Sequence, residues 1–369
     1  MRKFFVYLFV SFLVITCLCL SISLYKKNVI RITKTNFDTK QLEQNIKDNF
    51  PYLSIFKNAK NISLHLIDKN IYGNNEFFLD SEGNYRIIAK NKKEDLQKFI
   101  SSFNNLSSYL ETRKIPLYFV ELPDAQGGKE YLFRIVGNKK IELTKFTNVI
   151  NAPSHEWQSE HKNKFFFRTD FHFSTEGEIE IAKSISEILP IPKKSIDYYF
   201  SPENYRKVKL PFIGNTARVA DSILLKADDF NIYVPLFKTD ITEIVPSLGI
   251  KHRGSFETTL IHDLNLADKN SLKKASPYHY WVTNFGRYPQ PTYEIINHNQ
   301  PKGPSVLIIC DSIFMRGLSY LALVTHNIFV YDPRFNSDSK TLKTIIDDHK
   351  FDAIFVLGYS DHFYNLDFF

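Results

Sequence analysis

The chain has 369 residues, of which 43% are hydrophobic and 24% are charged, and its formal net charge is +7. This composition is typical of a globular protein with one large core or two small ones. The Lys and Arg residues are spread along the chain and no nucleic-acid-binding motif is present, so we do not expect nucleic acid as a partner. The positive charge would favour an anionic polysaccharide or a phospholipid surface.

The N-terminus carries a long apolar segment. After two basic residues, Phe4–Leu24 contains no charge, and roughly 20 apolar residues are enough to span a bilayer. The segment is longer than the apolar core of a usual signal peptide, so we predict an uncleaved anchor over residues 1–25; cleavage after Ser23 is the alternative. In both cases we expect the body outside the cytoplasm, in the first case as a single-pass protein of the cell membrane.

The first part of the body alternates between polar and apolar segments. A polar, Asn- and Lys-rich stretch over 26–59 is interpreted as a stalk or linker. Short strands are predicted at 62–67 and 75–80. Apolar residues at helical spacing then predict an amphipathic helix over 92–113, and the dense apolar run at 116–123 fits a buried parallel strand.

Helices and apolar strands alternate again further along the chain. Such alternation predicts an α/β layer with a mainly parallel sheet. Between 192 and 300 the pattern breaks, and short alternating segments with Pro and Gly predict a β-rich insertion. We expect helices at 174–189, 312–324 and 341–349, and strands at 305–310, 327–332 and 352–358.

The cysteines indicate neither a disulfide nor a metal site. Cys17 and Cys19 lie in the N-terminal segment, so only Cys310 belongs to the body. No C-x-x-C motif is present, and His155 and His161 lie on a polar loop without recognisable ligand spacing. We therefore expect no metal and no cofactor. Cys310 ends an apolar strand, which is typical of a buried thiol rather than of a nucleophile.

Ser312 lies where a strand changes into a helix, in the stretch VLIICDSIFMRG. In an open α/β sheet, ligands bind in the crevice beyond the carboxyl ends of the strands. A serine at this turn would have its hydroxyl near that crevice, and its backbone N–H could stabilise an oxyanion. The simpler interpretation is that serine caps the helix, as it does after many strands.

Asp170 and His172 stand two residues apart in RTDFHFSTEG, just before a predicted helix. A serine nucleophile needs a base, a histidine can accept its proton, and a carboxylate can orient that histidine. The pair could equally be a capping aspartate beside a hydrogen-bonded histidine, or half of a metal site. The two residues therefore complete a Ser-His-Asp set only if the fold brings them to Ser312.

These motifs together resemble the alginate O-acetyltransferase family, which belongs to the SGNH hydrolase-like group, and the related DHHW proteins. The resemblance rests on FFFRTDFHF before a helix and on strand–CDS–helix much later in the chain. Three further stretches agree with it: YFVELPDAQ, VYDPRF and FDAIFVLGYSDHF. It covers roughly residues 60–369 and implies one SGNH-like catalytic domain there, a three-layer α/β/α fold with a mainly parallel sheet.

The resemblance implies a role for each residue of the set. Ser312 would be the nucleophile, His172 the base and Asp170 the orienting carboxylate, with the Ser312 N–H as an oxyanion donor. Cys310 replaces a glycine of the family pattern and Phe173 replaces a tryptophan, and the second change would reshape the acceptor surface.

Three further residues are candidates for binding substrate, because they lie just past predicted strand ends: Arg334, Tyr359 and Tyr364. A surface ion pair or a core tyrosine is an equally good interpretation of each.

The activity implied is transfer of an acetyl group to an exopolysaccharide such as cellulose or an alginate-like polymer, or to a cell-wall glycan, through an acetyl-serine. Members of the family usually accompany a multispanning membrane O-acyltransferase, so that partner is expected as the acetyl donor. The alternatives are a carbohydrate acetylesterase, a protein that transfers D-alanine to teichoic acid, and a catalytically inactive, membrane-anchored scaffold that binds glycans.

Overall fold

The structure is a computed structural model. It describes residues 71–72, 77–79, 85–87, 93–122, 134–137, 149–151, 165–214, 216–217, 227–261, 290–335, 339–359 and 369. All of them belong to one compact unit, which comprises Asn70–Ala220 and Leu224–Phe369. The predicted anchor and the strand predicted at 62–67 lie outside the described residues. Within the described ranges, no helix is both long and apolar enough to cross a membrane.

The centre of the fold is a nine-stranded sheet in the order β10-β9-β11-β13-β12-β14-β4-β5-β6. Its four central strands are parallel, as the alternation of helices and strands predicted: β13 (Asn327–Tyr331), β12 (Ser305–Ile309), β14 (Ala353–Tyr359) and β4 (Leu117–Leu122). The outer strands are antiparallel: β11 (Thr292–Asn297), β9 (Ile241–Val245), β10 (Ile250–Gly254), β5 (Arg134–Gly137) and β6 (Val149–Asn151). The sheet is thus mixed, with a parallel centre.

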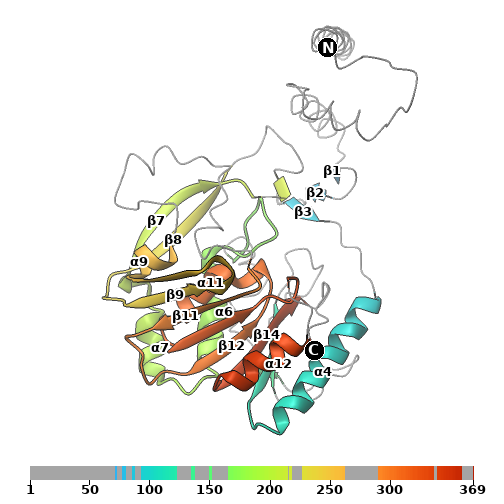
Figure 1. Cartoon of the computed structure of the whole chain (residues 1–369). Helices are drawn as coiled ribbons and strands as arrows, with labels where there is room; N and C mark the ends of the chain where they lie inside the picture. The colour runs from blue at the N-terminus through green and yellow to red at the C-terminus, as the bar shows by residue number, and fades with distance from the viewer. Residues whose placement is uncertain are drawn as a thin grey trace, which may run out of the picture. The chain divides into compact units, whose positions relative to one another are not determined.

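Helices cover both faces of this sheet, so the fold has three layers (Figure 1). Successive residues of β12 point to opposite faces, as they do in any strand. Leu307 and Ile309 share one apolar cluster with α4 (Lys93–Glu111) and α12 (Ser339–Asp348). Val306 and Ile308 share the other with α6 (Thr175–Ser186) and α11 (Met315–Leu321).

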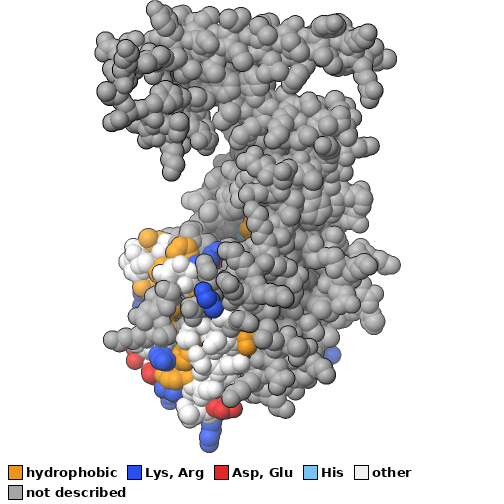
Figure 2. Space-filling model, turned by 90° about the vertical axis from the view of Figure 1, so that its right-hand side faces the viewer, with side chains coloured by type: hydrophobic (Ala, Val, Ile, Leu, Met, Phe, Trp, Pro, Cys, Tyr) orange, Lys and Arg blue, Asp and Glu red, His pale blue; other side chains and the backbone are white. Residues whose placement is uncertain are grey.

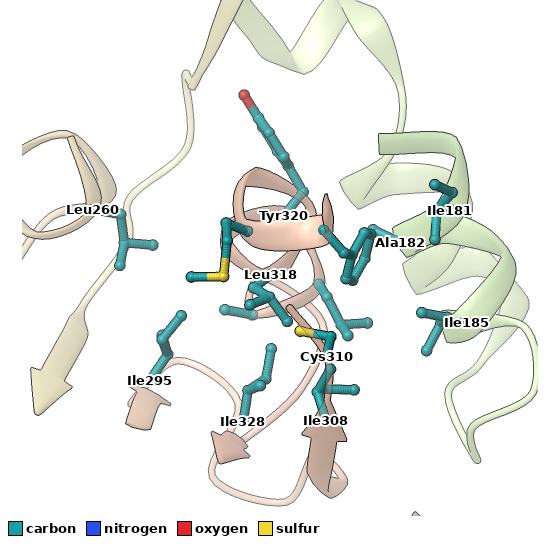
Figure 3. Close-up of a cluster of buried hydrophobic side chains, with 14 of the residues drawn as sticks. Ile181, Ala182, Ile185, Leu260, Ile295, Ile308, Cys310, Leu318, Tyr320 and Ile328 are labelled. Carbon is teal, nitrogen blue, oxygen red and sulfur yellow. The ribbon is translucent and has the colours of Figure 1, made fainter. Parts of the chain in front are cut away.

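Helix α6 shows why its sequence folds where it does. Ser174 caps its N-terminus by accepting a hydrogen bond from the Gly177 N–H at 3.2 Å. A Cβ atom at Gly177 would lie 2.4 Å from the carbonyl oxygen of Phe165, so only glycine allows this approach. Figure 3 shows the buried side chains of α6 facing α11 and the strands: Ile181, Ala182 and Ile185.

The stretch predicted to be β-rich divides into two parts. Strands β7 (Tyr205–Phe212) and β8 (Asp228–Pro235) form a separate antiparallel pair, whereas β9, β10 and β11 extend the main sheet. Alternate residues of β7 are buried, and this apolar face joins the same cluster as α6. The pair is also tied to α6 by Glu176, which accepts hydrogen bonds from Asn231 and the Tyr233 hydroxyl, both at 2.7 Å.

The remaining described elements are short. Strands β1 (Ile71–Tyr72), β2 (Phe77–Leu79) and β3 (Tyr85–Ile87) form a small antiparallel sheet. Two short helices flank the added strands: α7 (Lys193–Tyr199) and α9 (Phe256–Leu260). Single 3-10 turns lie at η3 (Pro202–Asn204), η4 (Pro246–Leu248) and η6 (Ser312–Phe314). The helix predicted over 312–324 therefore begins as a 3-10 turn and continues as α11.

Candidate active site

Ser312 is the first residue of the turn η6, directly beyond the carboxyl end of the central strand β12. The preceding Asp311 caps this turn, since its side chain accepts a hydrogen bond from the Ile313 N–H at 2.9 Å. The strand, the tight turn and the helix thus follow one another as the sequence predicted. Their order brings the serine to the edge of the sheet where open α/β folds bind ligands.

Asp170 and His172 lie in a tight reversal of the chain just before α6. Phe166 and Phe173 pair across it as an isolated antiparallel bridge. The Phe167 N–H donates to the His172 carbonyl at 3.3 Å, and the Ser174 N–H donates to the Phe165 carbonyl at 2.8 Å. The aromatic residues that flank the pair are buried in the core and hold the reversal in place: Phe165, Phe166, Phe167 and Phe173.

The structure brings the three predicted residues into one chain of contacts. The His172 Nδ1 atom lies 2.6 Å from the Asp170 Oδ1 atom, and the His172 Nε2 atom lies 3.4 Å from the Ser312 Oγ atom. Asp170 is fully buried and His172 is 3% exposed. In the tautomer that donates Nδ1–H to the carboxylate, Nε2 can accept the serine proton. This 3.4 Å contact is slightly longer than the ~2.6–3.2 Å of a short hydrogen bond.

Two segments that the sequence did not connect with the site hold the Asp170 loop. Asp228, at the start of β8, accepts hydrogen bonds from the Thr169 N–H at 2.7 Å and the Thr169 hydroxyl at 2.6 Å. The Gly214 N–H donates to the Thr169 Oγ1 atom at 2.8 Å. A Cβ atom at Gly214 would lie 2.3 Å from the Asp170 Cβ atom and 2.4 Å from its Oδ2 atom. Asp228 and Gly214 therefore hold Thr169, the residue before Asp170, and Gly214 packs closely against the Asp170 side chain.

Arg334 lies beyond the end of β13, the strand next to β12, and is paired with Asp332. Its Nη2 atom donates to the Asp332 Oδ2 atom at 2.8 Å, and its Nε atom donates to Oδ1 at 3.1 Å. Burial raises the pKa of Asp332 to about 7, the backbone hydrogen bond from Arg334 opposes this shift, and the Asp311 carboxylate adds to it. The Arg334 side chain is 32% exposed, so part of it is accessible to a ligand.

Of the two tyrosines predicted to bind substrate, the structure describes only Tyr359. Tyr359 is the last residue of β14 and pairs with Leu122 of β4, so it does end a central strand. Tyr364 lies outside the described residues. The contacts of the described part of the chain bring together Ser312, His172 and Asp170.

Cys310 is a core residue, as its position at the end of an apolar strand predicted. It is 1% exposed, and Figure 3 shows its side chain among those of the cluster beneath α11. Burial raises the pKa of its thiol well above the ordinary value, and the Asp311 and Asp332 carboxylates act in the same direction. A thiol held in its neutral form is a poor nucleophile.

Among the described residues, no three His, Cys, Asp or Glu side chains are grouped as they would be around a metal ion. In the described part of the face shown in Figure 2, Lys and Arg side chains are scattered among hydrophobic and other uncharged ones.

Comparison with known proteins identifies similar folds. The chain matches no protein-family model and no curated protein sequence. Bacillus cereus PatB1 with a sulfonyl adduct has a TM-score of 0.53 at 15% identity, over 77% of this chain and 93% of that chain. A second PatB1 structure scores 0.52 at 16% identity, over 77% and 95%. A DHHW family protein from Eubacterium siraeum scores 0.52 at 17% identity, over 76% and 89%. At identities this low, the structural similarity shows a shared fold and nothing further.

Proposed function

We propose that the chain is an O-acyltransferase that works through an acyl-serine formed on Ser312. The observation that carries this proposal is the continuous contact from the Asp170 carboxylate through the His172 ring to the Ser312 hydroxyl, at 2.6 and 3.4 Å. The arrangement has the parts that covalent acyl transfer needs: a nucleophile, a base within reach and a carboxylate behind it.

In the first half of the reaction, His172 Nε2 takes the hydroxyl proton while Ser312 Oγ attacks the carbonyl carbon of the acyl donor. The Ser312 N–H is the proposed donor to the resulting oxyanion. The tetrahedral adduct collapses, the bond to the leaving group breaks, and His172 returns its proton to that group. In the second half an acceptor hydroxyl replaces the leaving group, and the same steps in reverse release the ester and free Ser312.

The proposed acyl group is acetyl and the proposed acceptor is a glycan. This choice follows from the resemblance of FFFRTDFHF and the CDS motif to the alginate O-acetyltransferase family, and the chain shares its fold with Bacillus cereus PatB1. The acceptor would be a cell-wall glycan such as peptidoglycan, or an exopolysaccharide such as cellulose or an alginate-like polymer. We further propose an SGNH-like domain held on the outer side of the cell membrane by the N-terminal segment, with a multispanning membrane O-acyltransferase as the source of acetyl groups.

The test uses the full chain in detergent and an activated acetyl ester. We expect the wild type to gain one acetyl group on Ser312, located by intact-mass and peptide analysis. Ser312→Ala should gain none, and His172→Asn should gain it far more slowly. Ser195→Ala, a change on α7, is the matched serine control and should behave as the wild type. A wild type that is never acetylated on Ser312 would contradict the proposal.

A second measurement separates transfer from hydrolysis. Purified glycans are added to the acetylated enzyme, and both the loss of acetyl-serine and the acetylation of the glycan are followed. A transferase should lose its acetyl group faster with the correct glycan and pass it on. Release of free acetate at the same rate with every glycan would favour the acetylesterase alternative. A Ser312 that the activated ester never acetylates would favour the inactive glycan-binding scaffold.

A further inference from the structure

A charged pair lies fully buried between the two helices that follow the catalytic segments. Arg316 of α11 is 1% exposed and Glu178 of α6 is fully buried. The Arg316 Nε atom donates to the Glu178 Oε1 atom at 2.8 Å, and its Nη2 atom donates to the same oxygen. The other carboxylate oxygen, Oε2, accepts from the Gly317 N–H at 2.5 Å. The pair thus joins the start of α6 to α11.

The same guanidinium also reaches the segment of the predicted base. Its Nη2 atom donates to the carbonyl oxygen of Phe173 at 2.6 Å, and Phe173 directly follows His172 in the chain. Arg316 itself follows Ser312 by one helical turn. A single side chain therefore fixes the backbone next to His172 relative to α11, the helix that follows Ser312, although the two segments are far apart in sequence.

Folding stability alone does not explain why the Arg316–Glu178 pair is buried. Two charges taken out of water lose hydration that their attraction barely repays, and apolar side chains of similar volume often fold as well or better. The pair is not even fully satisfied: the Arg316 Nη1 atom is buried without a hydrogen-bond partner among the described residues. The Arg316 Cζ atom instead lies 5.2 and 5.4 Å from the ring centres of Phe167 and Phe230.

We propose that Arg316 and Glu178 are positioning residues, which set the distance between the His172 ring and the Ser312 hydroxyl. The inference rests on the proposed function, since it assigns those two groups to one reaction. A planar guanidinium can hold the Glu178 carboxylate and the Phe173 carbonyl at once, in fixed directions. An error of about 1 Å in the placement of a reacting group can cost about 100-fold in rate.

The decisive variant is the double change Arg316→Met with Glu178→Met, studied in the full chain. It removes both charges together, so neither is left buried alone, and it keeps the volume of the core. The Phe173 carbonyl and the Gly317 N–H lose their partners, so we expect the variant to fold with a moderately lower melting temperature. We also expect kcat for acetylation of Ser312 by the activated ester to fall by about 10- to 100-fold, with little change in KM.

Two further variants make the measurement specific. Arg316→Lys keeps the positive charge but loses the planar guanidinium that makes several hydrogen bonds at once, so it should also lower kcat. It supplies the result if the double variant does not fold. Ile346→Val trims a buried side chain of α12 on the opposite face of the sheet, and should lower stability slightly without changing kcat.

The outcomes distinguish this inference from the proposed function. Failure of the wild type to acetylate Ser312 would overturn the proposed function and the inference with it. A wild type that acetylates Ser312, together with folded variants that match its kcat, would overturn the inference alone.

Discussion

The two faces of the sheet are built alike but carry different kinds of polar contact. Helices α4 and α12 are joined at the surface by Asp347, which accepts hydrogen bonds from the Tyr109 hydroxyl and from Arg113. Exposed ion pairs of this kind contribute little, because water and salt screen them. Helices α6 and α11 are joined instead by the buried pair Arg316–Glu178.

This contrast shows where in the fold the chain tolerates the energetic cost of buried charge. The α4–α12 face packs apolar side chains and leaves its charges in water, which is the arrangement that serves stability alone. The α6–α11 face buries charged and titratable groups near Ser312, the proposed nucleophile, whose proposed reaction depends on exact geometry. Residues on the first face should therefore affect only folding, and residues on the second should affect both folding and rate.

The largest expected effect is on the second face. His172→Asn removes the base but retains a side chain of similar polarity, so the protein should fold. We expect the acetylation rate of Ser312 to fall by about 10³- to 10⁴-fold. Mass spectrometry of quenched time points measures this rate. A loss smaller than about tenfold would mean that His172 is not the base.

A matched pair of cavity-forming changes tests the comparison directly. Leu106→Ala on α4 and Ile181→Ala on α6 each truncate a fully buried side chain. Each should lower the free energy of unfolding by about 2–5 kcal/mol, as measured in urea. Only Ile181→Ala should also slow acetylation per folded molecule, because it loosens the helix that carries Glu178. Equal rates for the two variants would break the distinction between the faces.

A smaller effect is expected at Gly214. An added methyl group would meet the Asp170 side chain at 2.3–2.4 Å, so the carboxylate must move away. Gly214→Ala should cost about 1–3 kcal/mol in stability and slow acetylation about tenfold, because the displaced carboxylate no longer orients His172. Gly249→Ala is the control: its φ of 63° makes the change strained, yet a methyl group there meets no neighbour. A Gly214→Ala rate equal to that of the control would contradict this account.

The smallest effect concerns pH. The pKa of Asp332 is raised to about 7 in the folded chain, so its contribution to stability is fully present below about pH 4 and is lost as the pH rises through 7. Asp332→Asn should remove this dependence. The wild type should lose stability relative to the variant as the pH rises from about 4 to 7, because only its unfolded chain ionises in that range. A difference in unfolding free energy between the two proteins that stays constant at every pH, measured by denaturation in urea, would contradict this prediction.

Much of the fold could be predicted from local patterns. Helical spacing of apolar residues located α4, α6 and α12 to within a few residues, and dense apolar runs located the four parallel strands at the centre of the sheet. Such patterns are reliable because burial on one face or both leaves a periodic record in the sequence. The stretch between 192 and 300 was harder, since its short strands could form a separate unit or extend the main sheet.

The candidate site was predictable in its residue types but not in its support. Ser312, His172 and Asp170 could be named because a serine after a strand and a paired carboxylate and imidazole are local features. No local pattern identified the residues that support the site: Gly214, Asp228, Glu178 and Arg316. A glycine after a strand, or a charge in an amphipathic helix, is ordinary in sequence and is usually solvated.

The helices, the strands and the chemical groups at their ends follow from the sequence alone, because periodicity and capping are short-range properties. The 3.4 Å contact of the His172 ring with the Ser312 hydroxyl and the burial of Arg316 against Glu178 depend on the tertiary structure. The physical reason is that both contacts join residues roughly 140 positions apart in the chain. They exist only once the packing of α6 and α11 on the sheet has brought those segments together.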